Sequence, residues 1–267
     1  MIKKLFNFVK YTWNFFMLFK IPYAWLLNKL WFENSATNVL CKRPHILLTP
    51  FWNYLATTLF HYFCVVENYE PEIWNQIDKI SKQINWKDFY LINIWGNIWR
   101  WAIWLAKKYG YKVIAFEPGP STFHNLKTNT VLSNLDDDIE LYNVWLGSNN
   151  DILKFSMWTD CDAMWHIVDE KDMNEWMNII DVPVRRFDDL EIDSEKLNKT
   201  RLIIMDVEWY EFNVLKGMEK SLKDFRNIHI IMEIWEWHKN KQDTIKFMEN
   251  LWYKKRKIDN DNRVFCK

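Results

Sequence analysis

Carboxylate and amide side chains follow the ends of short apolar runs along this sequence. The run that begins at residue 88 ends in Asn93, Ile94 and a loop with Gly96 and Asn97, and the run 112–116 is followed by Glu117. A carboxylate after a strand can accept hydrogen bonds from ribose hydroxyls, and a glycine loop lets a ligand approach the backbone. We therefore expect a site for a cofactor that carries a nucleoside.

Later apolar runs are followed by further polar side chains, which are Asn143, Asp206, Glu208, Glu233, Glu236 and His238. Asp206 and Glu208 could belong to the site at the strand ends, or could instead stabilise the N-terminus of the next helix. A divalent metal on Asp206, Glu233 and His238 is conceivable. No tight ligand spacing supports it, so we predict no metal.

Asn97 in the first loop and Glu117 after the run 112–116 each have a second interpretation. Asn97 could contact the ligand or only cap the helix that follows it. Glu117 precedes Pro118 and could be a solvated acid, but its place at a strand end favours ribose binding.

The elements that must position these residues alternate along the chain. Apolar runs predict strands over 88–94, 112–116, 139–144, 201–206, 228–234, 252–258 and 262–266. Helical patterns cover 98–109, 120–134, 210–222 and 241–250. This alternation predicts an α/β fold, with a mostly parallel sheet and helices on both faces. Carboxyl ends of parallel strands share one edge, so we expect the polar residues to meet there.

A chain of 267 residues fits one large domain with an extension. We assign 66–267 to this domain and 1–65 to an N-terminal extension, because the part before residue 86 shows no clear periodicity. Residues 145–200 are less regular, and we interpret them as an insertion at the ligand edge that recognises the substrate.

Composition excludes some partners. Basic and acidic residues number 35 each, so no overall field favours nucleic acid. The four cysteines show no CxxC spacing, which fits a reducing cytoplasm.

Two N-terminal segments raise the question of membrane contact. Residues 1–30 interleave lysines with apolar side chains, which fits either a peripheral membrane segment or a helix packed on the domain. Residues 44–66 carry no formal charge, but Pro44, Pro50 and His61 favour a buried segment over a membrane span.

The balance of tryptophan and glycine is unusual. The chain has 18 Trp and 5 Gly, whereas ordinary usage predicts about 19 Gly. Trp also occupies positions where turns favour glycine, and we suspect glycine in the natural protein at Trp95, Trp99, Trp145, Trp209 and Trp252. Translation of UGA as glycine, as in some bacterial lineages, would produce this pattern. The alternative is a protein that is genuinely rich in tryptophan.

With glycine at 95 and 99, the first loop reads Gly-Gly-Asn-Ile-Gly. Its glycine spacing differs from the GxGxxG turn that binds the pyrophosphate of dinucleotides. A cofactor without phosphates, S-adenosylmethionine, fits better.

Four segments resemble, in the right order, motifs of the FkbM-type methyltransferases. They are NIWGNIWR (93–100), FEPGP (116–120), NVWLG (143–147) and DVEWYE (206–211), the last followed by VLKG. In the family these correspond to D-x-G-A-N-x-G, F-E-P-x-P, the segment after the third strand, and D-V-E-G-x-E. The sequence departs from the pattern at Asn93, where Asp is usual, and at Ile204, where Lys is common.

The resemblance implies a Rossmann-like class I methyltransferase with S-adenosylmethionine as methyl donor. It implies O-methylation of a small molecule, such as a secondary metabolite, or of a sugar or glycan. The implied cofactor-binding residues are Asn93, Trp95, Gly96, Asn97, Trp99, Glu117 and Asn143, with Asp206 and Glu208 as catalytic candidates. The alternative is an inactive methyltransferase-like scaffold, because an indole at 95 would fill space that the methionine part of the donor needs.

Overall fold

The computed structural model describes residues 71–84, 89–96, 100–158, 161–168, 173, 178–207 and 209–267. It also describes two short strands, β1 (His45–Leu48) and β2 (Asn53–Ala56), which pair with each other antiparallel. The expectations for residues 1–30 lie outside the described residues. Within the described part of the chain, no helix has both the length and the apolar character needed to cross a bilayer.

A seven-stranded sheet forms the centre of the domain, in the order β12-β13-β11-β10-β3-β4-β5. Its strands are β3 (Tyr90–Ile94), β4 (Lys112–Phe116), β5 (Ile139–Tyr142), β10 (Thr200–Met205), β11 (His229–Glu233), β12 (Lys254–Lys257) and β13 (Asn262–Cys266). β5, β4, β3, β10 and β11 run parallel. β13 is antiparallel to both of its neighbours, β11 and β12, so β12 runs in the same direction as the five parallel strands. The predicted mostly parallel sheet is confirmed, since apolar runs buried on both faces are typical of such strands.

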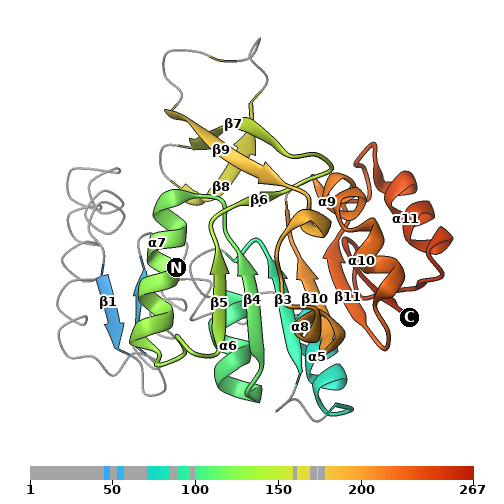
Figure 1. Ribbon diagram of the computed structural model, residues 1–267, viewed down its shortest axis with the longest axis horizontal. Helices are drawn as coiled ribbons and strands as arrows, with labels where there is room; N and C mark the ends of the chain where they lie inside the picture. The colour runs from blue at the N-terminus through green and yellow to red at the C-terminus, as the bar shows by residue number, and fades with distance from the viewer. Residues whose placement is uncertain are drawn as a thin grey trace, which may run out of the picture.

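Helices cover both faces of this sheet (Figure 1). One face carries α5 (Pro71–Ser81), α6 (Arg100–Tyr109) and α7 (Pro120–Leu132). The other carries α8 (Ser194–Asn198), α9 (Glu211–Gly217), α10 (Glu219–Asp224) and α11 (Lys241–Asn250). Alternate residues of one strand enter different clusters: Ile92 packs with the second group and Leu91 with the first.

Two expectations about helices were wrong. The part before residue 86 contains α5, whose Ile73, Ile77 and Ile80 are buried at helical spacing. The single helix predicted over 210–222 is two helices, because the backbone leaves helical geometry at Met218 (φ −109°, ψ 8°).

Residues 145–185 are more regular than the sequence suggested. They form a second sheet in the order β6-β9-β7-β8, made of β6 (Trp145–Leu146), β7 (Asp151–Trp158), β8 (Cys161–Ile167) and β9 (Asn178–Arg185). The short helix η3 (Phe187–Asp189) follows it. This sheet lies across the end of the central sheet where β5 leads into β6 (Figure 1). Buried Trp145, Phe155 and Val184 join it to the main core.

Candidate functional site

Strand register brings the predicted polar residues to one edge, here called the carboxyl edge. Ile94 pairs with both Phe116 and Met205, and Phe116 pairs with Tyr142. The residues that follow these strand ends therefore leave the sheet at one level, and they are Trp95, Glu117, Asn143 and Asp206. Ligands of open α/β sheets bind in the crevice at such an edge.

Glu117 has a buried and oriented carboxylate. Its side chain is 1% exposed, so the alternative of a solvated acid was wrong. Its Oε1 accepts hydrogen bonds from the backbone N–H of Gly119 at 2.9 Å and from Oγ1 of Thr122 at 2.6 Å. Thr122 was not predicted as a site residue, although its place in the first turn of a helix directly after the acid was visible in the sequence.

Asn143 supports the backbone that follows β4. Its Nδ2 donates to the carbonyl oxygens of Glu117 at 2.8 Å and Pro118 at 3.1 Å. The backbone N–H of Glu117 in turn donates to Tyr142 O at 3.0 Å. In the described structure, Asn143 thus holds the turn that carries the Glu117 carboxylate.

The loop after β3 packs tightly on its neighbours. The N–H of Gly96 donates to Phe116 O at 2.7 Å, which fixes the loop beside Glu117. A Cβ at Gly96 would lie 2.9 Å from Leu126 Cδ2, so the Leu126 side chain would have to shift to make room for it. Asn97 and Trp99 lie outside the described residues.

Asn93 is fully buried beneath this loop. Its Nδ2 donates to Trp95 O at 3.4 Å, while its Oδ1 has no hydrogen-bond donor among the described residues. A buried acceptor without a donor costs free energy, about 1–3 kcal/mol. A ligand that donates a hydrogen bond there would recover this cost.

Trp95 has a left-handed backbone, with φ of +74°. The side chain is 7% exposed, and its ring meets that of Trp145 edge to face at a centroid distance of 4.9 Å. For a residue with a Cβ this conformation costs about 1–2 kcal/mol. The described residues other than glycine with positive φ are Trp95, Asn134, Trp209, Asn227 and Trp252.

The two catalytic candidates follow β10. Asp206 is half-buried, and its backbone N–H lies 3.4 Å from Ile94 O, so this residue sits beside the loop after β3. Glu208 lies outside the described residues. Further along the same turn, Trp209 N donates to Oε1 of buried Glu211 at 3.2 Å.

Tyr210 is a residue near this edge that sequence reasoning missed. Its ring centroid lies 5.6 Å from that of Trp145, between α9 and the second sheet. Burial raises the pKa of its phenol, and the charge of Asp151 adds to the effect. The phenol therefore stays protonated near neutral pH and can donate a hydrogen bond.

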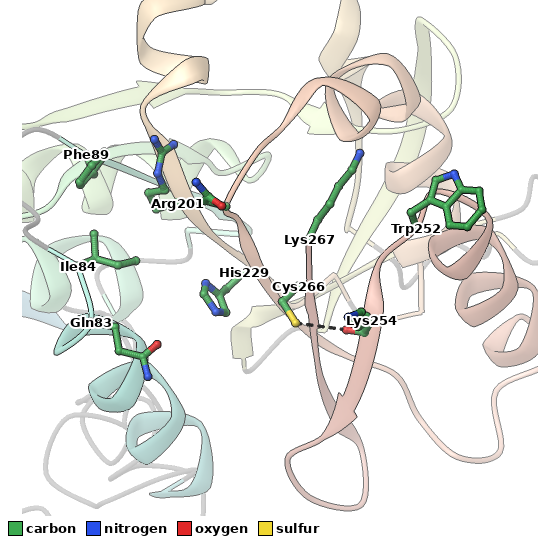
Figure 2. A pocket seen from close by; sticks show the side chains of 10 residues that line it. Gln83, Ile84, Phe89, Arg201, His229, Trp252, Lys254, Cys266 and Lys267 are labelled. Carbon is green, nitrogen blue, oxygen red and sulfur yellow. Dashed lines mark hydrogen bonds between the residues drawn. The ribbon is translucent and has the colours of Figure 1, made fainter.

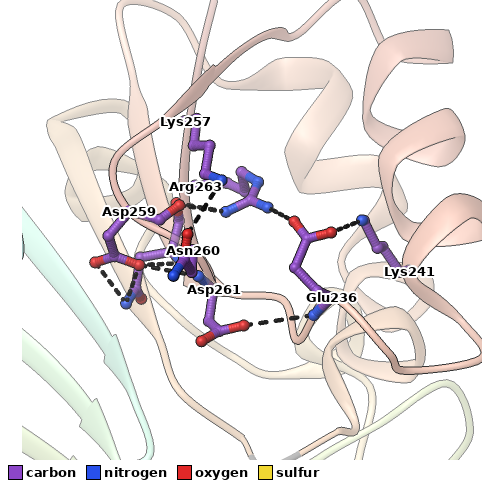
Figure 3. Close-up of polar contacts among 8 residues, drawn as sticks. Glu236, Lys241, Lys257, Asp259, Asn260, Asp261 and Arg263 are labelled. Carbon is purple, nitrogen blue, oxygen red and sulfur yellow. Dashed lines mark hydrogen bonds and ion pairs between the residues drawn. The ribbon is translucent and has the colours of Figure 1, made fainter.

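An ion-pair cluster holds the loop after β11. Figure 3 shows the Glu236 carboxylate between Arg263 of β13 and Lys241 of α11, and it pairs with both. The hydrogen bond from Lys241 is the main cause of the lowered pKa of Glu236. Arg263 is 4% exposed and also donates to the carbonyl of Asp259 at 3.0 Å. This loop is therefore anchored to the hairpin of β12 and β13.

The described residues contain no group of three His, Cys, Asp or Glu side chains that could hold a metal ion. Glu233 ends β11. His238 lies five residues further on, where burial lowers its pKa.

Comparison with known proteins adds to this geometry. The sequence model described as Methyltransferase FkbM domain matches residues 89–256. A curated relative, Methyltransferase 1 of Beauveria bassiana (strain ARSEF 2860), is 23% identical over 163 residues, which cover 55% of this chain and 65% of the relative.

Solved structures of low similarity include M. jannaschii TYW2 in complex with AdoMet (TM-score 0.42, 14% identity, 83% of each chain). A putative rRNA methylase from Clostridium thermocellum has a TM-score of 0.46 at 9% identity, over 73% of this chain and 93% of the other. The family match covers more than half of the sequence. It includes β3, β4, β5 and β10 and the residues that follow them at the carboxyl edge. The chain belongs to the FkbM methyltransferase family.

Proposed function

We propose that this chain is an S-adenosylmethionine-dependent methyltransferase that methylates a hydroxyl group of a small molecule, sugar or glycan. The observation that carries the proposal is the Glu117 carboxylate, which is buried, oriented by two donors and set beside the Gly96 loop. Membership of the family supports the reaction class.

The residues at the carboxyl edge fit this cofactor. The Glu117 carboxylate would accept hydrogen bonds from the ribose hydroxyls of the cofactor, and the cofactor could approach the backbone closely at Gly96. Oδ1 of Asn93 would accept a hydrogen bond from the amino group of the methionine part, which satisfies a buried acceptor. The bound donor supplies a sulfonium whose methyl group is already activated for displacement.

The protein would mainly position the acceptor and exclude water. Asp206 or Glu208 would orient the acceptor hydroxyl or take its proton. The second sheet lies across the same edge, so residues on it would form part of the acceptor site (Figure 1).

Glycine at several Trp positions is part of this proposal. Trp95, Trp209 and Trp252 have φ of +74°, +76° and +69°, and the glycine at 110 has +74°. Glycine adopts such backbone without the steric cost of a Cβ. Trp145 is absent from this left-handed group, so glycine at 145 rests on the sequence motif alone.

The end of α11 gives the clearest of these cases. Trp252 N donates to Glu249 O at 2.9 Å and Tyr253 N to Met248 O at 3.1 Å, which is the pattern of a Schellman motif with Trp252 at C′. The indole is 84% exposed, so little packing offsets the strain. The end of α7 has the same pattern with Asn134, a residue that tolerates this conformation.

A second candidate function is a scaffold that binds no cofactor. The observation that favours it is the Trp95 indole, which is nearly buried against Trp145 beside the proposed cofactor crevice. In this case the natural protein has tryptophan at position 95, and the Trp95 indole fills the proposed cofactor crevice.

Calorimetry with S-adenosylmethionine separates these readings. One protein carries Trp as written, a second carries glycine at positions 95, 99 and 209, and a third carries Trp237→Gly alone as a control for loss of an exposed indole. Binding by the second protein alone supports methyl transfer together with glycine at these positions. Binding by none of the three supports the scaffold, and equal binding by all three contradicts the glycine assignment.

Peptide mass spectrometry of the protein from its natural source tests the glycine assignment directly. Glycine masses at positions 95, 209 and 252 are expected, and tryptophan at 95 and 209 would contradict the proposal.

A further inference from the structure

A cavity of about 690 Å³ lies at the amino edge of the central sheet, opposite the carboxyl edge. The strands β10 and β11 begin there with Arg201 and His229 near their first positions, and Phe89 precedes β3. Lys254 and Cys266 reach the cavity from the antiparallel strands β12 and β13. The proposed methyl-transfer site is at the other end of the same strands, so the two are separate.

The cavity is lined by basic side chains. Arg201, Lys254 and Lys267 carry a positive charge at neutral pH, and the uncharged His229 ring lies among them. None of the described lining residues is an acid. In Figure 2 the His229 ring lies between Gln83 and Ile84 on one side and Cys266 and Lys254 on the other. The Lys267 side chain extends away from His229, and its ammonium donates to Leu222 O at 3.2 Å and Lys223 O at 2.9 Å. Cations on the wall of a cavity raise the local concentration of anions.

Two of the lining residues have shifted pKa values. Burial lowers the pKa of Lys267, and the charge of Arg226 lowers it further, while Asp224 acts in the opposite direction. Burial and then the charge of Arg256 lower the pKa of His229. Burial is the main cause of both shifts, and a neighbouring cation adds to each.

One wall of the cavity is apolar. The guanidinium carbon of Arg201 lies 4.5 Å from the ring centroid of Phe89, and Ile84 lies beside them. Arg201 Nη1 is anchored by the carbonyl oxygens of Asn198 and Thr200, both at 2.8 Å. The stacked guanidinium is therefore held in place, and the wall offers a surface for a flat or apolar group.

His229 adds an unsatisfied group. Its Nδ1 is buried and has no hydrogen-bond partner among the described residues. An anion bound nearby would favour the protonated imidazole, in which this nitrogen becomes a donor.

We propose that the cavity between Arg201, His229, Lys254 and Lys267 binds a small soluble anion that carries a phosphate or carboxylate on a flat, apolar body. The cations would contact the acidic group and the Phe89 wall would contact the body. The volume is much larger than a phosphate ion needs, which is why a body is part of the assignment.

Trp252 also lines this cavity. If this position is glycine in the natural protein, the cavity is wider there and its cationic residues are unchanged. The test therefore uses the full chain both as written and as its Trp252→Gly variant, and the anion should bind to both.

Phenyl phosphate is the probe, and phenol is its uncharged counterpart. Calorimetry should show saturable binding of phenyl phosphate and none of phenol, and the NMR signals of the His229 ring should shift during the titration. Lys254→Met should weaken binding about tenfold, because it removes a charge-assisted hydrogen bond. Lys257→Met is the matched control, since it removes one charge from the same exposed strand outside the cavity, and it should leave affinity within about twofold.

Three results would overturn the proposal. They are no saturable binding at millimolar phenyl phosphate, equal weakening by Lys254→Met and Lys257→Met, and binding that leaves the His229 signals unchanged. Binding to vesicles of phosphatidic acid is measured as well. Lys254-dependent binding to vesicles without binding of phenyl phosphate would contradict a soluble ligand. Donor binding at the carboxyl edge plays no part in these readouts, so they stand apart from the methyltransferase proposal.

Discussion

The backbone of α9 meets the segment after β6 with no space for a side chain between Gly217 and Gly147. A Cβ at Gly217 would lie 2.0 Å from the carbonyl oxygen of Gly147 and 3.0 Å from its carbonyl carbon. The second sheet is therefore docked on the helix that follows the Asp206 turn. Movement of that sheet would have to carry α9 with it.

This contact predicts that Gly217→Ala destabilises the protein. In an exposed helix the same change adds about 1 kcal/mol of stability, but here overpacking should cost about 1–3 kcal/mol. Urea unfolding followed by circular dichroism measures the change. Lys216→Ala on the same helix should stay within about 0.5 kcal/mol. A more stable Gly217→Ala protein would show that the contact is not tight.

Trp252→Gly should stabilise the protein as written. Removing the Cβ from a left-handed C′ position relieves about 1–2 kcal/mol, and the exposed indole contributes little packing. The matched control is Trp237→Gly, which removes a 67% exposed indole from a position outside the left-handed group and should not stabilise. Thermal unfolding compares the two, and equal effects would contradict the backbone argument.

Glu117→Gln should weaken binding of S-adenosylmethionine by about tenfold to a hundredfold. The amide keeps the shape but loses the charge that strengthens hydrogen bonds from ribose hydroxyls. Calorimetry should be done on the chain with glycine at positions 95, 99 and 209, together with exposed Glu191→Gln as a control. Unchanged affinity in a folded Glu117→Gln protein would remove this residue from the cofactor site.

Stability should depend on pH through His229. Burial lowers its pKa below the ordinary 6.5, so the unfolded state binds more protons between 6.5 and the folded value. The free energy of unfolding should therefore fall as pH decreases through 6.5. Urea unfolding at pH 7.5 and 5.5 measures this, and His229→Gln should reduce the difference while exposed His124→Gln should not. An identical difference in all three proteins would contradict the role of His229.

The central sheet was readable from sequence because its strands are short apolar runs buried on both faces. β4 was placed at its observed bounds, and β10 and β11 within about a residue. The second sheet was missed because its strands gain burial only by docking on the carboxyl edge. Along β7 the adjacent residues Asp151 and Ile152 are both exposed, and the adjacent residues Phe155 and Ser156 are both buried, so no simple alternation marks the strand.

The candidate site was partly readable for a related reason. Residues after strand ends share an edge by topology, so the placement of Glu117 and Asp206 followed from the sheet alone. The donors that orient Glu117, and the turn that Asn143 holds, depend on side-chain geometry that spacing does not encode. The left-handed backbone at Trp95, Trp209 and Trp252 supports the glycine hypothesis that composition raised.

The placement of β13 between β11 and β12 has a consequence for biosynthesis. If the Trp codons are UGA, an expression host that stops at UGA releases only products that lack Asn262–Cys266, because the last Trp is at residue 252. A product released at residue 252 contains β11 but lacks β13, which pairs with its outer edge. The backbone N–H and C=O groups of that edge are then unpaired, which invites intermolecular pairing and precipitation.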